Sequence, residues 1–265
     1  EIISDVSSRS IPCYISSNLN NMRNMDAVLR AKPHEIIVSV SGFEQDIYSK
    51  GHASGDIEKV KRNMQELSAL RGKVADEIGH TTWLRVVFHR YRDNAVEEQR
   101  MKAFAEALQF TFSPVWAYVT TVDRMLEIIG GEVFRQDQEV MDRLAPSFED
   151  GLELSRSVKT SDRCGLLEDK LAIDVDGNVA ICCGSSLHPR NIVGSYLDHP
   201  FDEIQRMRRN NSLCGPCMSN GLPNYFLYSG TGEGGFEKAG QRQREDHAAK
   251  LKPRRRLFKI FSASP

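Results

Sequence analysis

The stretch Glu35-Ile36-Ile37-Val38-Ser39-Val40-Ser41-Gly42-Phe43 decides the fold class of this chain. Its β-branched run Ile36-Ile37-Val38 is typical of a strand that is buried on both faces, as in parallel sheets. A segment with apolar residues at helical spacing, 56–70, follows it. Outward from this pair, the sequence predicts further strands at 11–16, 83–89 and 115–120, and further helices at 25–31, 96–108 and 122–129. Such alternation predicts an α/β fold with parallel strands and helices outside.

The composition excludes some kinds of binding partner. The chain has 265 residues, 35 Lys+Arg and 36 Asp+Glu, so its formal net charge is -1. This balance argues against a nucleic-acid binder, which carries a large positive excess. No apolar run approaches the roughly 20 residues that cross a bilayer, and no signal-peptide pattern opens the chain. We therefore expect no nucleic-acid partner, no membrane span and a cytoplasmic location.

The cysteines gather in one segment. Cys164 is followed by twelve residues, Gly177, four residues and Cys182, with Cys183 next, and Cys214-Gly215-Pro216-Cys217 comes about thirty residues later. Residues 170–183 predict a hairpin that carries Cys182 towards Cys164. Together with the CxxC turn, this hairpin supplies four thiolates, which suit zinc or an iron–sulfur cluster. The spacing alone leaves iron–sulfur, zinc and no metal open, and Cys13 is expected to be a small buried hydrophobe.

Several motifs, in their order along the chain, match one family. The run 35–43, Tyr48 and an Asn-containing helix with Asn63 resemble the fourth strand and helix of radical S-adenosylmethionine (SAM) enzymes, with Ser41 where that family has Asp. Residues 15–19 resemble its turn after the third strand, and residues 86–94 with Glu97 resemble its fifth strand. The cysteine spacing resembles the C-terminal SPASM or "twitch" extension, as do residues 192–196 and 201–204.

The resemblance implies a domain organisation. Residues 1–131 would be strands three to six of a partial (βα)6 radical SAM barrel, and 132–163 a linker. Residues 164–228 would form the SPASM/twitch-like iron–sulfur domain, and 229–265 a Gly-rich linker and basic tail. Two departures stand out. No cysteine follows Cys217, so one auxiliary cluster is expected, and the family's CxxxCxxC is absent. Either about 80–120 residues precede Glu1 in the natural protein, by family length, or the chain naturally lacks that motif.

The resemblance also implies an activity. In that family a reduced 4Fe-4S cluster cleaves SAM, and a 5′-deoxyadenosyl radical abstracts hydrogen from the substrate. We expect an oxidoreductase that modifies a peptide or a small, sugar-like metabolite, with flavodoxin or ferredoxin as reducing partner. Its cofactors would be an auxiliary 4Fe-4S cluster in this chain, SAM and a second 4Fe-4S cluster. The alternatives are a non-catalytic iron–sulfur or zinc-binding interaction module and a plain zinc-stabilised α/β protein.

The candidate site residues fall into two groups. The metal-ligand candidates are Cys164, Cys182, Cys183, Cys214 and Cys217, with Cys183 as a substitute or spare. The candidates for contact with SAM are Ser39, Ser17, Asn18, Arg85 and His89. The structural alternative for Ser39, and for Ser41 near it on the same strand end, is strand-end packing and turn hydrogen bonding. For Arg85 and His89, the alternative is that both side chains lie on the outer face of the sheet and do not point into the lumen of the barrel.

Overall fold

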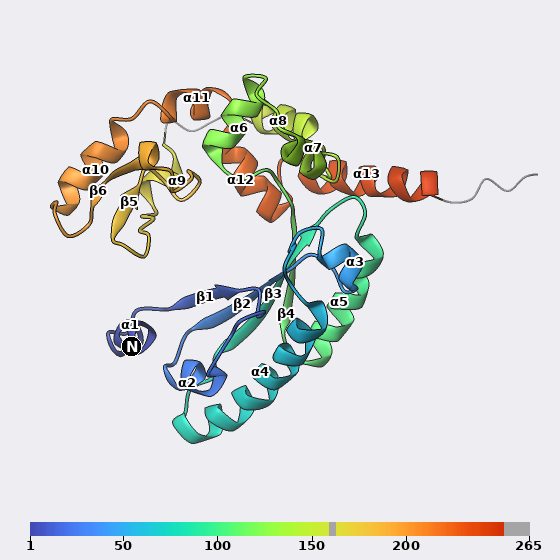
Figure 1. Cartoon of the computed structure of the whole chain (residues 1–265), viewed down its shortest axis with the longest axis vertical. Coiled ribbons are helices and arrows are strands. Elements are labelled where there is room, and N and C mark those ends of the chain that lie inside the picture. Colours follow the sequence, from blue (N-terminus) through green and yellow to red (C-terminus); the bar gives the residue numbers. More distant parts are fainter. Residues whose placement is uncertain (159–162, 252–265) are drawn as a thin grey trace, which may run out of the picture.

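The fold is built on a four-stranded parallel sheet. The computed structural model describes residues 1–158 and 163–251. The strands are β1 (Tyr14–Ser17), β2 (Glu35–Val40), β3 (Trp83–Arg90) and β4 (Thr111–Trp116), in the spatial order β1-β2-β3-β4. Since this order follows the chain, right-handed crossovers put the connecting helices on one face. In Figure 1, α2, α4 and α5 indeed cover one face. The expected α/β class with parallel strands is confirmed.

The helices around the sheet begin and end at recognisable signals. They are α1 (Ile2–Ser8), α2 (Met25–Arg30), α3 (Gln45–Tyr48), α4 (Ile57–Ile78) and α5 (Ala95–Ala107). The side chain of Asp56 caps α4 by accepting the Lys59 N–H at 3.0 Å, and Gly79 ends the helix with a φ of +64°. Helix α4 therefore runs eight residues beyond the expected end at residue 70, and its apolar side packs against β2 and β3.

The two faces of the sheet differ. On β3, Leu84, Val86 and Phe88 are buried beneath the helices, whereas Arg85 and His89 point to the opposite face and are half-buried. The side chains of β3 thus alternate between the two faces, as in any strand. All-parallel sheets normally have both faces covered. In Figure 1 the β5–β6 hairpin lies on the side away from α4 and α5.

One predicted strand was wrong. Residues 115–120 were expected to form it, but β4 is Thr111–Trp116. Pro114 sits within β4 and cannot donate a ladder hydrogen bond, which argues against a central strand from sequence alone. The proline is tolerated because β4 lies at the edge of the sheet.

A second core forms beyond β4. It contains α6 (Val122–Ile129), α7 (Arg135–Met141), α8 (Phe148–Ser157), α12 (Leu222–Thr231) and α13 (Phe236–Leu251). Thus the described part of 132–163, expected to be a loop-rich linker, contains α7 and α8. The expected Gly-rich linker that starts at residue 229 is largely helical, because α12 and α13 leave only residues 232–235 between them. Residues 252–265 of the expected basic tail lie outside the described residues.

The cysteine segment forms a small unit of its own. It comprises α9 (Gly165–Glu168), β5 (Asn178–Ala180), the short 3₁₀ helix η1 (Pro189–Asn191), β6 (Ile192–Ser195), α10 (Phe201–Arg209) and α11 (Cys214–Ser219). The predicted hairpin is confirmed: Ile173 pairs with Val179 across a turn in which Gly177 adopts a φ of +83°. Strand β6 then pairs antiparallel with β5.

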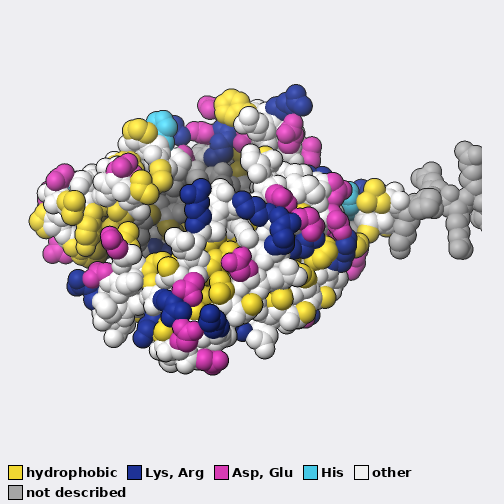
Figure 2. All heavy atoms as spheres, turned by 60° about the horizontal axis from the view of Figure 1, so that its bottom comes forward, with side chains coloured by type: hydrophobic (Ala, Val, Ile, Leu, Met, Phe, Trp, Pro, Cys, Tyr) yellow, Lys and Arg dark blue, Asp and Glu magenta, His cyan; other side chains and the backbone are white. Residues whose placement is uncertain are grey.

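The surface carries both signs of charge. Figure 2 shows basic and acidic side chains interspersed over the face in view, in keeping with the near-zero net charge. Among the described helices, none is both long and apolar enough to cross a membrane.

Candidate functional site

Four cysteines from distant parts of the cysteine segment line one cavity. Cys164, Cys182, Cys214 and Cys217 surround a space of about 160 Å³. The remaining lining residues are mostly apolar: Val122, Leu166, Leu167, Ile181, Leu213 and Met218, together with Glu168. The structure thus brings together four of the five cysteines that the sequence put forward.

Local structure explains the position of each thiol. Cys164 precedes α9, and Cys182 follows β5 in the hairpin. Cys214 and Cys217 lie three residues apart in α11, so they share one face of that helix. The side-chain amide of Asn211 donates a hydrogen bond to Cys214 Sγ at 3.2 Å. The sulfurs therefore approach the cavity from three separate elements.

The cavity is a poor place for free thiolates. Burial raises the pKa of Cys217 to about 12, with further increases from neighbouring Cys164, Cys182 and Cys214. Burial also raises the pKa of Cys182, although the backbone N–H groups of Gly184 and Ser185 oppose this. Bound positive charge would offset the cost of ionising these thiols, as it does in metal–thiolate sites. The donor set therefore fits a zinc ion or an iron–sulfur cluster.

Cys183 and Cys13 lie elsewhere. Cys183 is exposed and borders a second pocket with Tyr118 and Lys170. Cys13 is half-buried just before β1, although the sequence suggested a buried hydrophobe. Within residues 1–158 and 163–251, no three His, Cys, Asp or Glu side chains gather tightly enough to share a single metal ion. The four sulfurs border one cavity.

Several contacts fasten the cysteine segment to α6, among them an ion pair between Arg190 and Glu127 at 2.6 Å. The Val122 N–H donates to the Gly184 carbonyl at 2.7 Å. The Asp123 carboxylate accepts from the Ser186 N–H at 2.8 Å and from the Ser186 hydroxyl at 2.6 Å. Although burial alone would raise it, these hydrogen bonds and one from Thr121 bring the pKa of Asp123 down to about 2. Asp123 therefore holds the two units together as a carboxylate.

A polar pocket lies at the carboxyl ends of the strands. Its volume is about 350 Å³, and it is lined by Ser41, Gly51, His52, His89, Tyr91, Ala117, Tyr118, Val119, Thr120, Asp137 and Val140. In open α/β sheets, ligands bind at this edge. We call it the strand-edge pocket. Of the residues put forward for SAM contact, His89 alone is among those that line it.

The pocket contains groups that suit ligand binding. Burial lowers the pKa of His89, although a hydrogen bond to the Val40 carbonyl opposes the shift. Burial, then the proximity of His89, lowers the pKa of His52. Both rings are therefore neutral at neutral pH. The hydroxyl of Ser41 is buried and has no hydrogen-bond partner among the described residues. Sequence reasoning did not select His52, because no motif marks it.

Ser39, Ser17 and Asn18 lie near this edge but make local contacts. Ser39 Oγ is 3.4 Å from Ser16 Oγ on the face without helices. Ser17 Oγ accepts the Leu19 N–H at 3.0 Å, and Asn18 Oδ1 accepts the Asn20 N–H at 3.1 Å. The last two side chains thus shape the turn after β1.

Arg85 lies farther from the pocket. It pairs with Thr111, the first residue of β4, and its guanidinium donates to the Glu35 carboxylate at 2.6 Å. Both residues point to the face without helices, where Arg85 Nε has no hydrogen-bond partner among the described residues. The charge of Arg85 is therefore already matched within the chain.

The residues that carry the resemblance brace the strand ends. Asn63 donates to the Leu19 carbonyl at 2.6 Å, and Tyr48 accepts from Asn20 at 2.7 Å. The Glu97 carboxylate accepts the N–H groups of Phe43 and Glu44, both at 2.7 Å. These bonds hold the loops after β1 and β2, on which the strand-edge pocket depends.

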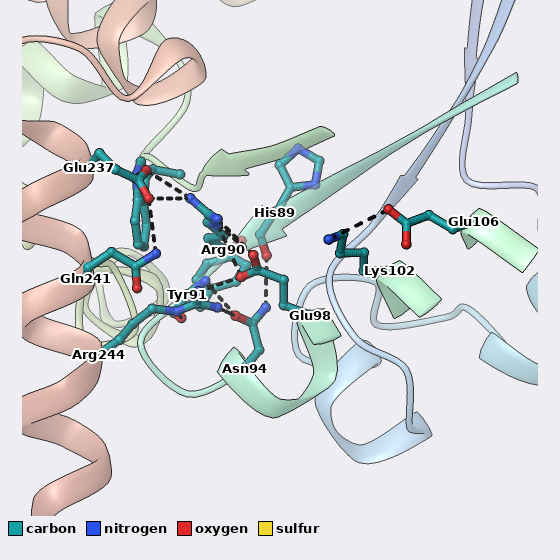
Figure 3. Close-up of polar contacts among 11 residues, drawn as sticks. His89, Arg90, Tyr91, Asn94, Glu98, Lys102, Glu106, Glu237, Gln241 and Arg244 are labelled. Atoms are coloured by element: carbon teal, nitrogen blue, oxygen red, sulfur yellow. Dashed lines mark hydrogen bonds and ion pairs between the residues drawn. The ribbon is translucent and has the colours of Figure 1, made fainter. Parts of the chain in front are cut away.

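Helix α13 also holds the end of β3 in place, through contacts with Arg90, Glu98 and Trp116. Arg90 and Arg244 both donate to Glu98, and Glu237 accepts from Arg90 and from the indole of Trp116. In Figure 3 the ring of His89 is turned away from this cluster. The network therefore anchors β3 while leaving the His89 ring available to the strand-edge pocket.

Tyr118 connects the pockets. It borders the strand-edge pocket and also the pocket that contains Cys183. Its ring packs edge-on against Phe226, with centroids 5.0 Å apart. Burial raises its pKa, and so does the nearby Cys183 thiol. The cysteine segment thus reaches the wall of the strand-edge pocket.

No protein-family model matches the chain, and no curated protein matches it either.

Proposed function

We propose that this chain is part of a radical SAM-type enzyme and that Cys164, Cys182, Cys214 and Cys217 hold an auxiliary 4Fe-4S cluster. The observation that carries the proposal is the shared cavity of these four thiols. Four thiolates suit a zinc ion or a 4Fe-4S cluster, and the resemblance of the cysteine spacing to the SPASM or twitch extension favours the cluster. When bound, the cluster would supply one-electron chemistry.

The sheet supports the enzyme class. Its strands are parallel and sequential, and its helices lie on one face, as in one arc of a barrel. The strand-edge pocket would accept SAM and a peptide or small sugar-like substrate. There the neutral His89 ring, whose N–H donates to the Val40 carbonyl, can accept a hydrogen bond from a ligand, and the neutral His52 ring can donate or accept one. Tyr91 and Tyr118 would limit access of water. Flavodoxin or ferredoxin remains the proposed electron donor.

Anaerobic reconstitution tests the cluster. The chain is expected to take up about four iron and four sulfide ions and to absorb broadly near 400 nm, as such clusters do. Cys217→Ala should lose most of this iron, because the cavity then has only three thiols. Cys183→Ala is the matched control and should keep it, since Cys183 lies outside the cavity.

Two results would contradict the proposal separately. Stoichiometric zinc without iron uptake would favour the zinc-binding module. The enzyme class is tested on the protein expressed from its whole gene, reduced with dithionite in the presence of SAM. Release of 5′-deoxyadenosine is expected, and a fully loaded protein that leaves SAM intact would argue for a non-catalytic iron–sulfur module.

A further inference from the structure

Arg208 is buried beside the cysteine cavity without an anionic partner. It lies on α10 with no exposed surface. Its guanidinium donates to the carbonyls of Ile181 at 2.8 Å and Lys170 at 2.6 Å, and to the side-chain oxygen of Gln205 at 2.9 Å. All three acceptors are neutral. Within the described chain, no carboxylate lies within ion-pair distance of Arg208, although fully buried arginines are almost always paired.

The neighbours on α10 show the contrast. Arg209 forms an ion pair with Glu168 at 2.6 Å, and Arg206 forms one with Glu203 at 3.4 Å. Both of these arginines are exposed. The helix thus pairs its surface arginines with carboxylates and places the third cation inside the cysteine unit.

Ionisable groups of the cysteine unit surround Arg208: Cys182, Glu168 and Cys214 are among those that favour its charged form. Ile181, whose carbonyl binds Arg208, directly precedes Cys182. Asn211 donates both to the backbone carbonyl of Arg208 and, at 3.2 Å, to Cys214 Sγ. Burial lowers the pKa of Arg208, and Cys182 is the group that opposes this most. Arg208 is thus connected to the ends of two cavity-lining segments.

We infer that Arg208 is the buried counter-charge of the cysteine cavity. A guanidinium buried without an anion is costly, and four thiolates outweigh the charge of a zinc ion or a four-iron cluster. The loaded cavity would therefore be anionic, and Arg208 would balance it. This inference rests on the proposed function. Since a positive charge favours the more negative redox state, Arg208 should also raise the reduction potential of the cluster.

The test compares variants of the reconstituted full chain by iron and sulfide content and by reductive titration. Arg208→Gln, which removes the charge, should load less iron and titrate at a more negative potential. Arg208→Lys should stay close to the wild type. Asn211→Ala, which removes one N–H···S bond, should shift the potential less but in the same direction. Arg209→Gln is the matched control and should change neither quantity.

The outcomes separate the two proposals. If the wild type takes up neither iron nor zinc, the proposed function fails, and this inference fails with it. If the wild type loads but Arg208→Gln matches it in content and potential, only the counter-charge is overturned. Equal shifts in Arg208→Gln and Arg208→Lys would also overturn it, because shape would then matter and charge would not. Should Arg208→Gln be unable to fold, the test rests on Arg208→Lys. An Arg208→Lys variant that takes up iron and titrates at the wild-type potential supports the inference, whereas an Arg208→Lys variant that also misfolds contradicts it.

Discussion

Arg244 of α13 and Glu98 of α5 form a buried ion pair, with Nη1 and Oε2 2.5 Å apart. The two residues are 146 positions apart in the chain. Glu98 also accepts from Arg90, and Arg244 also donates to the Tyr91 carbonyl at 2.8 Å. The C-terminal helix is therefore an integral part of the wall that supports β3.

Arg244→Met should destabilise the fold by about 3 kcal/mol, because it leaves a buried carboxylate with one fewer cation. Urea unfolding would measure the change. Arg242→Met on the exposed side of the same helix is the matched control, and a change of less than about 0.5 kcal/mol is expected there. Equal effects of the two substitutions would show that α13 does not depend on this ion pair.

Gly240→Ala should also loosen α13. A Cβ at this position would lie 2.6 Å from the Trp116 ring, so the helix or the indole must shift. We expect a loss of about 1–3 kcal/mol, as for overpacked cores. Gly230→Ala in α12 meets open space and should instead be neutral or stabilising. Thermal unfolding of both variants decides, and a Gly240→Ala variant as stable as the wild type would contradict the close approach.

Ser41→Ala should stabilise the protein by about 1 kcal/mol in the absence of a ligand. The buried Ser41 hydroxyl has no partner among the described residues, so its removal ends an uncompensated desolvation cost. Ser155→Ala provides the contrast. The Ser155 hydroxyl is equally buried but donates to the Gly151 carbonyl at 2.7 Å, so its loss should destabilise. Denaturant titrations of both variants test the pair, and a destabilised Ser41→Ala would reveal a partner for that hydroxyl.

Stability should fall as the pH drops below about 6.5, the ordinary pKa of an unfolded histidine. Burial lowers the pKa of His89 in the folded chain. Between the folded and unfolded values the unfolded state binds more protons, so stability rises with pH across this window. His89→Gln should reduce the dependence, measured as unfolding free energy from about pH 7 to 5. His247→Gln, outside the strand-edge pocket, should retain it, and an unchanged slope in His89→Gln would contradict burial of that ring.

Much of the sheet could be predicted from local pattern. The buried strand at Ile36-Ile37-Val38, the strand at 83–89 and the helix that follows residue 56 each depend on neighbours in sequence, and each was predicted. The hairpin before Cys182 was predicted for the same reason. The four-cysteine cavity was anticipated from spacing, since the hairpin and the CxxC turn constrain where their thiols can lie.

The rest depended on contacts between distant residues. Helix α13 looked like a linker and tail because its glycines suggested flexibility, yet Gly240 serves close packing on Trp116. His52 carried no sequence signal, because it joins the strand-edge pocket only through the fold. Likewise Arg208 resembled the other arginines of α10 until its burial was known. When a residue is buried by elements far away in the chain, the local sequence pattern around it does not reveal that burial.

The shared position of Tyr118 has a consequence for ligands of the two pockets that it lines. Because its side chain lines both, a ligand that displaces the ring in one pocket would change the shape of the other. A covalent label on the exposed Cys183 would press on the same ring. Thiol-reactive fragments attached at Cys183 would therefore offer a route to changing the strand-edge pocket from outside it.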